Sequence, residues 1–225
     1  MKWIAFYGVN MTITSIEEIY VGRSKKKIAY KIYADEAYLF LLYSQDIRQY
    51  NLKVGEEING LLYDKIVEET VYRRAKQRAL ATLKRTDKTE YEIRIRLKDA
   101  HYTNDIIDMT IEYLKNYNYI NDERYASNYI RFYKLSRSKF VLRRKLIEKG
   151  INKDLLEEII SKEYLVMDHE IDPEIIALNK AISKKYSDIS SLSWQEKQKL
   201  ISSLYRKGFA IDKIQSHLKD IETCN

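Results

Sequence analysis

Apolar residues recur at the same offsets in three stretches of the chain, and this repeat predicts most of the fold. When Leu97, Leu146 and Leu204 are aligned, each stretch has an aliphatic residue four positions earlier and an apolar residue five positions later. An aspartate and two more aliphatic residues then follow at shared positions. Because steps of four residues place side chains on one face of a helix, each stretch predicts two helices that meet at a tight corner.

The corner lies four residues after each aligned leucine. Gly150 and Gly208 occupy it in the second and third stretches, where a helix end commonly needs a left-handed residue. His101 occupies it in the first stretch, and histidine adopts that conformation less readily. The sequence therefore leaves the local geometry of the first corner open.

Capping signals delimit the remaining helices. Thr89 and Ser193 each begin a capping box, with a glutamate three residues later. Asn121 precedes two acids of a first helical turn, and Asp172 precedes a proline at the first helical position. Together with a helix expected from about residue 58 to 85, these signals predict three three-helix repeats.

Alternating residues near the start of the chain predict strands. Residues 11–16 and 27–33 alternate, and residues 37–43 form a third apolar run. Asp35 and Glu36 would form the turn between the second and third strands. A small antiparallel sheet follows, and the helix after Gly55 could cover one of its faces.

The predicted fold class is mainly α. Three tandem three-helix repeats form an elongated, curved body, preceded by a small antiparallel β-sheet subdomain. The expected divisions are a β-rich subdomain at 1–60, repeats at 61–120, 121–165 and 172–222, and a linker around 166–171. Since Met11 begins a regular strand, we hypothesise that translation starts there and that residues 1–10 are a mis-assigned start.

Positive charge is concentrated in the middle repeat. The chain carries a net charge of +7, yet residues 124–149 alone hold nine basic residues and one acid. Basic residues also occur on the second helix of the first and third repeats. Repeated basic helices suit a long, negatively charged partner, although charge runs are often only solvated surface.

Other chemistry is not indicated by the sequence. The three histidines show no metal-ligand spacing, and Cys224 is the only cysteine, which predicts no metal site and no internal disulfide. Phosphate-cradling glycine motifs and a nucleophile elbow are absent, so no cofactor and no catalytic residues are expected. Tyr125, Tyr129 and Tyr133 could stack on bases, but their four-residue spacing favours a packed seam.

Three motifs resemble those of the RecX regulatory proteins. They are Asn121-Asp122-Glu123-Arg124-Tyr125-Ala126, the segment from Arg143-Arg144-Lys145-Leu146 to Gly150-Ile151, and the segment from Lys197-Gln198-Lys199-Leu200 to Gly208-Phe209. The resemblance covers about residues 72–221 and keeps the order of the three repeats. The first 60 or so residues resemble the variable N-terminal part of the family only loosely.

The resemblance implies a non-enzymatic, cytoplasmic bacterial protein that modulates the RecA recombinase. Members of the family lie in the groove of the RecA filament on single-stranded DNA and typically restrain ATP hydrolysis and strand exchange, in control of DNA repair, homologous recombination and the SOS response. For this chain, a monomer with no membrane contact is expected. From charge and repeat position, the predicted contacts with RecA or DNA are Arg94, Arg96, Arg137, Lys139, Arg143, Arg144, Lys145, Arg206 and Lys207.

Two other functions stay open at this point. Three-helix units also serve as helix-turn-helix readers, so the chain could bind single- or double-stranded DNA without RecA. The second and third helices lack a cluster of Asn, Gln and Arg at a helix start that would face base edges, which argues against sequence reading. An enzymatic role is the weakest hypothesis.

Overall fold

The chain folds into two compact units, Met1–Ile120 and Asn121–Asn225. The computed structural model describes residues 10–22, 27–165, 171–186, 189 and 191–223. The hypothesis of a late start concerns residues 1–10, and the predicted linker spans residues 166–171. Both segments lie almost wholly outside the described residues. The elongated body and the four-part division of the chain stay predictions.

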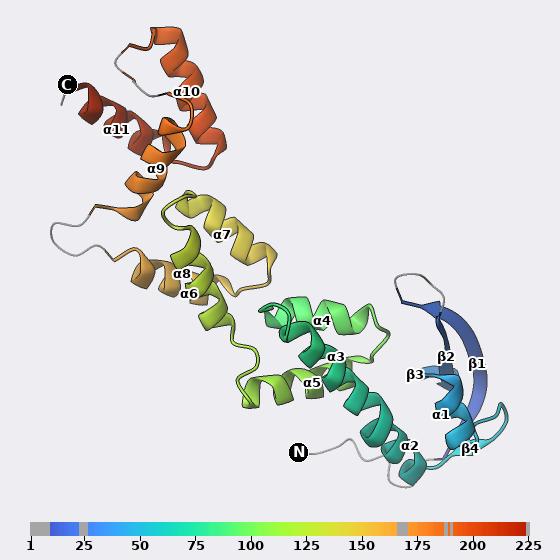
Figure 1. The fold of residues 1–225 in the computed structure, drawn as a ribbon. Helices are drawn as coiled ribbons and strands as arrows, with labels where there is room; N and C mark the ends of the chain where they lie inside the picture. The colour runs from blue at the N-terminus through green and yellow to red at the C-terminus, as the bar shows by residue number, and fades with distance from the viewer. Residues whose placement is uncertain (1–9, 23–26, 166–170, 187–188, 190, 224–225) are drawn as a thin grey trace. The chain divides into compact units, whose positions relative to one another are not determined.

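The first unit begins with the predicted antiparallel sheet, which has four strands (Figure 1). They are β1 (Met11–Val21), β2 (Lys27–Ala34), β3 (Ala37–Leu42) and β4 (Glu57–Ile58), in the order β3-β2-β1-β4. Asp35 and Glu36 form the turn between β2 and β3 with φ of 46° and 64°, as expected for a two-residue hairpin. The sequence did not predict β4, because two residues are too few to show alternation.

A short helix, α1 (Ser44–Gln49), follows the sheet and was also not predicted. Its Asp46 is only 3% exposed, and the Asp46 side chain accepts the backbone N–H of Tyr43 at 2.8 Å. The guanidinium of Arg74 donates to both carboxylate oxygens of Asp46. This partly buried bidentate pair therefore ties α1 to the long helix of the first repeat.

The long helix has three consecutive parts: α2 (Gly60–Ile66), a π-helical segment η1 (Val67–Tyr72) and α3 (Arg73–Leu83). It begins at Gly60, two residues after the expected start, because the Asn59 side chain caps it and Ile58 pairs with β1. Ile66, Val67 and Val71 pack with sheet residues in one apolar core. The expected cover of the sheet is therefore confirmed.

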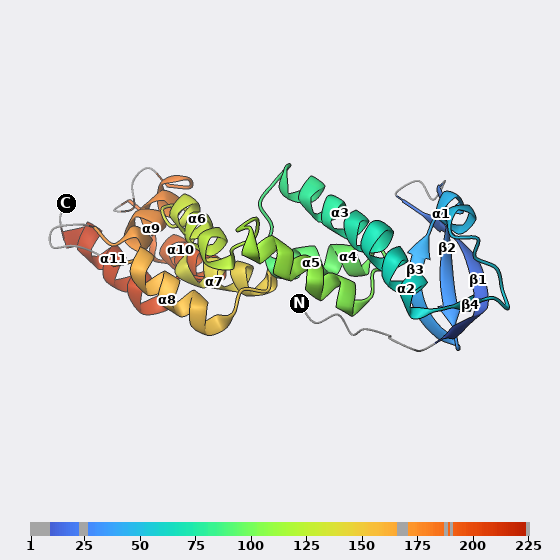
Figure 2. The ribbon, with the colours of Figure 1, turned by 90° about the horizontal axis from the view of Figure 1, so that it is seen from below.

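The first triplet is completed by α4 (Glu90–Lys98) and α5 (Asn104–Asn116). Thr89 forms the predicted capping box with Glu92, and Thr103 occupies the N-cap position of α5. Ile93 and Leu97 belong to the same core as the sheet residues. Figure 2 shows the long helix running from the sheet to α4 and α5 within this unit.

The second unit contains two further triplets. Their helices are α6 (Asp122–Tyr133), α7 (Lys139–Glu148), α8 (Lys153–Glu163), α9 (Pro173–Ser183), α10 (Trp194–Arg206) and α11 (Ile211–Thr223). The predicted caps are confirmed, since the side chains of Asn121, Asp172 and Ser193 accept backbone N–H groups at the starts of α6, α9 and α10. Each triplet has its own apolar core, and the aligned Leu146 and Leu204 are almost fully buried in them.

The corner between second and third helices is the same in all three triplets. His101, Gly150 and Gly208 have φ of 63°, 81° and 82°, which is the left-handed region. The N–H of each corner residue donates to the carbonyl three residues earlier, and the next N–H donates to the carbonyl of the aligned leucine. These paired bonds define a Schellman motif, so His101 keeps the geometry that glycine gives the other corners.

Glu174 joins the two triplets of the second unit. Its carboxylate, in a residue only 9% exposed, accepts the N–H of Lys139 at the start of α7 at 3.0 Å. It also pairs with Lys213 of α11 at 2.9 Å, and Lys213 reaches Asp172 at 2.7 Å. One buried carboxylate therefore connects α7, α9 and α11.

The left-handed φ of His101 predicts that glycine is the better residue at this corner. We expect His101→Gly to raise the free energy of unfolding by about 0.5–1 kcal/mol, because glycine has no Cβ to strain the left-handed backbone. The reciprocal Gly150→His should lower it. Urea unfolding of both variants tests this, and a loss of stability in His101→Gly would contradict it.

The buried position of Glu174 predicts a graded response to substitution. Glu174→Ala removes both the acceptor for Lys139 and the partner of Lys213, and should cost about 2–3 kcal/mol of unfolding free energy. Glu174→Gln keeps an acceptor oxygen and should cost less. Glu158→Ala, at an exposed position of α8, is the control in chemical denaturation. Equal small costs for all three variants would show that the junction does not depend on this carboxylate.

Candidate functional site

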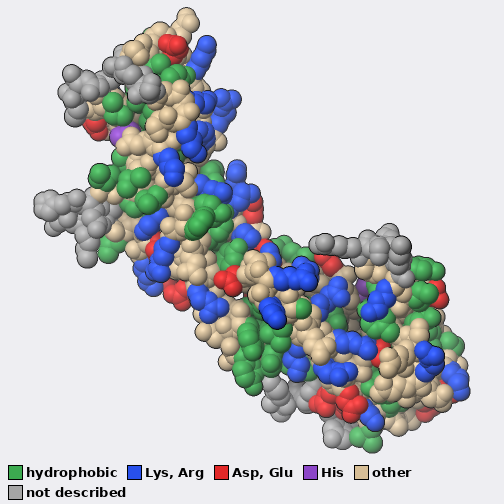
Figure 3. All heavy atoms as spheres, in the orientation of Figure 1, with side chains coloured by type: hydrophobic (Ala, Val, Ile, Leu, Met, Phe, Trp, Pro, Cys, Tyr) green, Lys and Arg blue, Asp and Glu red, His purple; other side chains and the backbone are tan. Residues whose placement is uncertain are grey.

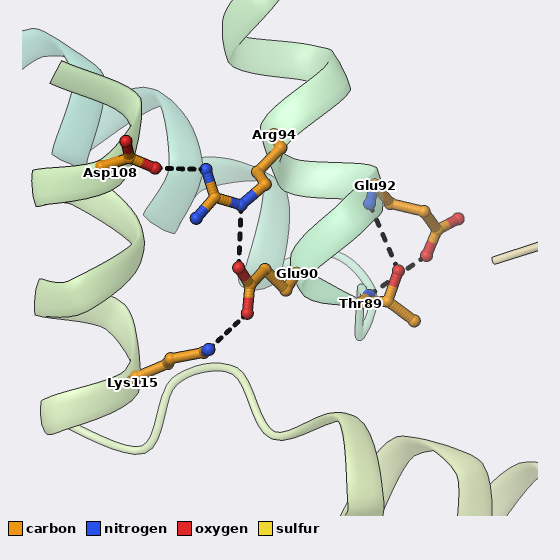
Figure 4. Close-up of polar contacts among 6 residues, drawn as sticks. All are labelled: Thr89, Glu90, Glu92, Arg94, Asp108 and Lys115. Atoms are coloured by element: carbon orange, nitrogen blue, oxygen red, sulfur yellow. Dashed lines mark hydrogen bonds and ion pairs between the residues drawn. The ribbon is translucent and has the colours of Figure 1, made fainter. Parts of the chain in front are cut away.

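Arg94 and Arg143 occupy the same repeat position, three residues before the aligned leucine, and both reach across the corner to the third helix. Arg94 donates to Asp108 of α5 and, at 2.8 Å, to Glu90 of its own helix (Figure 4). Arg143 donates to both oxygens of Glu157 of α8, at 2.6 and 2.7 Å. In each case the acid lies fourteen residues after the arginine, so the interaction is repeated.

We call these two pairs the interhelix clamps. In the second clamp, the hydrogen bond from Arg143 lowers the pKa of Glu157. Glu90, which also accepts from Arg94 on the same helix, is affected in the same direction. Burial alone would raise the pKa of Glu90, but Lys115 and Arg94 outweigh it and lower that pKa. The third triplet has Ile201 and Gln215 at the equivalent positions and so lacks a clamp.

The clamps change the interpretation of two of the nine predicted contact residues. Arg94 and Arg143 already have carboxylate partners within their own triplets. Their side chains are 38% and 35% exposed, so a partner could still touch them, but only beside an existing ion pair. Their first role in the structure is to hold the second helix to the third.

The other predicted residues are less engaged. Arg96, Arg206 and Lys207 are exposed. Among the described residues, Arg144 and Lys145 pair with Glu148 of their own helix alone, at 3.7 and 2.7 Å, and such exposed pairs are weak. These five residues therefore keep most of their charge available at the surface.

Arg137 and Lys139 lie against aromatic rings. The Arg137 guanidinium is 4.0 Å from the centroid of the Tyr133 ring and donates to the Tyr129 hydroxyl at 3.2 Å. The Lys139 ammonium is 4.4 Å from the Tyr164 centroid. Cation–π contacts orient these side chains without neutralising them.

The structure brings Arg137 and Lys207 together at one pocket of the second unit. Lys180 of α9 and Lys184, the C-cap residue of that helix, line the same pocket, and they were not predicted from the sequence. They lie four residues apart on one helix face, but they are separated from the basic run of residues 124–149 by a whole helix. Figure 3 shows Lys and Arg side chains gathered over this part of the second unit.

The tyrosines of α6 form the predicted seam. Tyr125, Tyr129 and Tyr133 are half-buried and pack against the core of the second triplet. Neighbouring ring centroids are 6.4 and 4.7 Å apart. The predicted packing of these residues is therefore confirmed.

The described residues offer neither a metal-binding cluster nor a membrane-spanning helix. Among them, no group of three or more His, Cys, Asp or Glu side chains is placed to hold a metal ion. None of the described helices is both long and apolar enough to cross a membrane.

These features define a class: a protein of tandem three-helix repeats with left-handed corners and basic second helices. Sequence models of two RecX domains match this chain. They are "RecX, first three-helix domain" at residues 75–114 and "RecX, third three-helix domain" at residues 174–218. "Regulatory protein RecX" of Clostridium acetobutylicum is 33% identical over 213 residues, covering 93% of this chain and 96% of that protein. The chain belongs to the RecX family of regulatory proteins.

Other relatives agree with this assignment. "Regulatory protein RecX" of Clostridium perfringens strain SM101 is 35% identical over 192 residues, covering 80% of this chain and 84% of that protein. A "Crystal structure of regulatory protein RecX" shares the fold with a TM-score of 0.58 at 22% identity, covering 93% of this chain and 99% of the other. RecX from Lactobacillus salivarius gives a TM-score of 0.56 at 23% identity, over 68% and 97% of the two chains.

The clamp geometry predicts a measurable coupling between Arg143 and Glu157. A double-mutant cycle with Arg143→Gln and Glu157→Gln should give about 0.5–1 kcal/mol at neutral pH. The control cycle on Arg144 and Glu148, which are 3.7 Å apart within one helix, should give less.

The pH dependence of this coupling has a definite sign. Since Arg143 lowers the pKa of Glu157 in the folded chain, the stabilisation is complete above the ordinary carboxyl range and is lost as the pH falls through the lowered pKa, below about pH 4. Repeating both cycles at two pH values tests this. A coupling near zero at pH 7, or one that grows on acidification, would contradict the clamp.

Proposed function

We propose that this chain is a non-enzymatic regulator of the RecA recombinase, which binds in the groove of the RecA filament on single-stranded DNA and modulates its ATPase and strand-exchange activities. The observation that carries the proposal is family membership across almost the whole chain, at 33% identity over 93% of its length. Relatives are named regulatory proteins, and the RecA role comes from the family to which they belong.

The surface charge of the triplets supports the proposal that the partner is acidic and extended. The second helices of the triplets and the C-cap of α10 present five cations with little or no internal neutralisation: Arg96, Arg144, Lys145, Arg206 and Lys207. Charged residues of this kind raise the rate of encounter with a polyanion and fix its orientation more than they add affinity. We assign the polar contacts with the filament chiefly to these five residues and to Arg137 and Lys139.

Arg94 and Arg143 have a supporting role in this proposal. Their clamps hold the second helix of a triplet at a fixed angle to the third, and so position the exposed cations beside them. Loss of a clamp should therefore weaken filament binding indirectly.

Modulation needs no chemistry on this chain. A protein that contacts neighbouring RecA protomers shifts the filament toward whichever state it binds more tightly. The size of the effect is limited by the difference between its affinities for the two states. Inhibition of ATP hydrolysis then follows if the preferred state turns over slowly.

The proposal is tested by titrating this chain into RecA and ATP on single-stranded DNA. We expect the rate of ATP hydrolysis to fall, and we expect Arg144→Glu with Lys145→Glu to raise the concentration for half-inhibition at least tenfold. Lys53→Glu with Lys65→Glu, at exposed positions of the first unit outside the second helices, makes the same charge change and should alter it less than twofold.

Two outcomes would count against the proposal. An unchanged ATPase rate across the titration would remove RecA as the target. Equal effects of the two double variants would remove the second helices as the contact surface. A gel shift with naked DNA, run in parallel, distinguishes RecA regulation from autonomous DNA binding. A shift at concentrations well below those that affect RecA would favour autonomous DNA binding.

A further inference from the structure

We propose that the pocket lined by Arg137, Lys180, Lys184 and Lys207 is a phosphate-binding site of the second unit. The pocket has a volume of about 280 Å³ and lies where the α6–α7 turn, the end of α9 and the α10–α11 corner meet. Its remaining lining residues are Ser136, Ser138, Val141, Ala181 and Phe209. Four cations and no acid therefore surround one small space.

These four cations line one pocket and have no carboxylate partner among the described residues. Elsewhere on the unit, Arg131, Arg143 and Lys213 each pair with an acid at less than 3 Å. Among the residues that the structure describes, none forms an ion pair with Arg137, Lys180, Lys184 or Lys207. Because like charges repel, four neighbouring cations favour an anion between them.

Close packing between the start of α7 and the α10–α11 corner fixes one side of the pocket. The Ser138 side chain is almost fully buried, and its hydroxyl donates to the carbonyl of Lys207 at 2.7 Å. Gly208 comes so close that a Cβ there would lie 2.8 Å from Ser138 Oγ and 2.9 Å from Phe140 Cδ1. The start of α7 therefore packs directly on the α10–α11 corner, and this contact sets the separation between the cations on either side.

Arg137 is held in place before any ligand arrives. The Tyr129 hydroxyl accepts a hydrogen bond from its guanidinium, and the Tyr133 ring lies under it. An arginine fixed in this way offers its remaining N–H groups at little entropic cost, and its planar fork matches two oxygens of a phosphate. The three lysines can then add charge from flexible side chains.

The chemistry of the lining favours phosphate over other anions. A phosphate group presents several oxygens and up to two charges in a small volume, whereas a carboxylate presents two oxygens and one charge. Phe209 is the aromatic residue of the lining, and with 2% of its surface exposed it cannot offer a stacking face to a base. The pocket should therefore bind phosphate without reading base sequence.

Two sources share this chemistry: the phosphodiester backbone of a nucleic acid and a free phosphate compound. The test uses the full chain without RecA, so its result does not depend on the proposed function. Binding of a fluorescent oligothymidylate is followed by anisotropy at several salt concentrations, and pyrophosphate and polyglutamate are added as competitors.

The decisive variant is Lys180→Gln with Lys184→Gln, which removes two charges from exposed positions in and just after α9. Its matched control is Lys199→Gln with Lys219→Gln, which removes two charges from exposed positions of α10 and α11 outside the pocket. Thermal unfolding of both variants checks that the triplet stays folded. Arg137 is left intact because it also contacts the tyrosine seam.

We expect the pocket variant to bind the oligonucleotide at least tenfold more weakly than the control, with a slope of log affinity against log salt that is smaller by roughly 0.7–1.4. Pyrophosphate should compete in the wild type and fail to do so in the pocket variant. Pyrophosphate binding that the pocket variant loses, without oligonucleotide binding, assigns the pocket to a free phosphate compound. Equal losses in both variants, or competition by polyglutamate as strong as that by pyrophosphate, would overturn the proposal.

Discussion

Each triplet depends on one backbone conformation, the left-handed residue between its second and third helices. The corner brings the N–H groups of two consecutive residues onto carbonyls of the preceding helix, and it directs the third helix back against the second. Leu97, Leu146 and Leu204 each lie at the same distance before such a corner, and all three are almost fully buried. The apolar repeat and the corner thus specify the same arrangement three times, once with histidine in place of glycine.

Once the corner is fixed, it determines which basic residues meet an acid. In the first two triplets it places an arginine of the second helix opposite an acid of the third, and these charges are used within the fold. Residues one or two positions further along the second helix point elsewhere and keep their charge at the surface. Basic residues that are close in the sequence therefore have two roles. Some form ion pairs within the fold, and others keep their charge available to a partner.

Much of the fold follows from patterns that act over short distances along the chain. The Asp35-Glu36 turn, the capping boxes at Thr89 and Ser193, and the apolar spacing within helices all involve neighbours in sequence, and all were predicted. The features that were missed depend on distant contacts: β4 exists because Ile58 pairs with Met11, and α1 is held by Asp46 and Arg74, which are 28 residues apart. The π-helical segment within the long helix likewise had no sequence signal that we recognised.

The candidate site likewise has features that the sequence predicted and features that it did not. Excess charge on the second helices was visible in the sequence, but its division between clamps and exposed cations was not. A signal for the clamps did exist, since Arg94 and Arg143 share a repeat position and each has an acid fourteen residues later. No comparable signal joins Lys180 and Lys184 to Arg137 and Lys207, because only the packing of the α6–α7 turn on α9 and the α10–α11 corner brings them together.

The central claim is that exposed cations of the triplets, and not the sheet, contact a RecA filament. Hydrogen exchange measured on the full chain, free and bound to RecA on single-stranded DNA, tests it most directly. The account predicts slower exchange in α7, in the α6–α7 turn and at the α10–α11 corner, with little change in β1, β2 and β3. Protection confined to the strands, with unchanged exchange throughout the second unit, would contradict it.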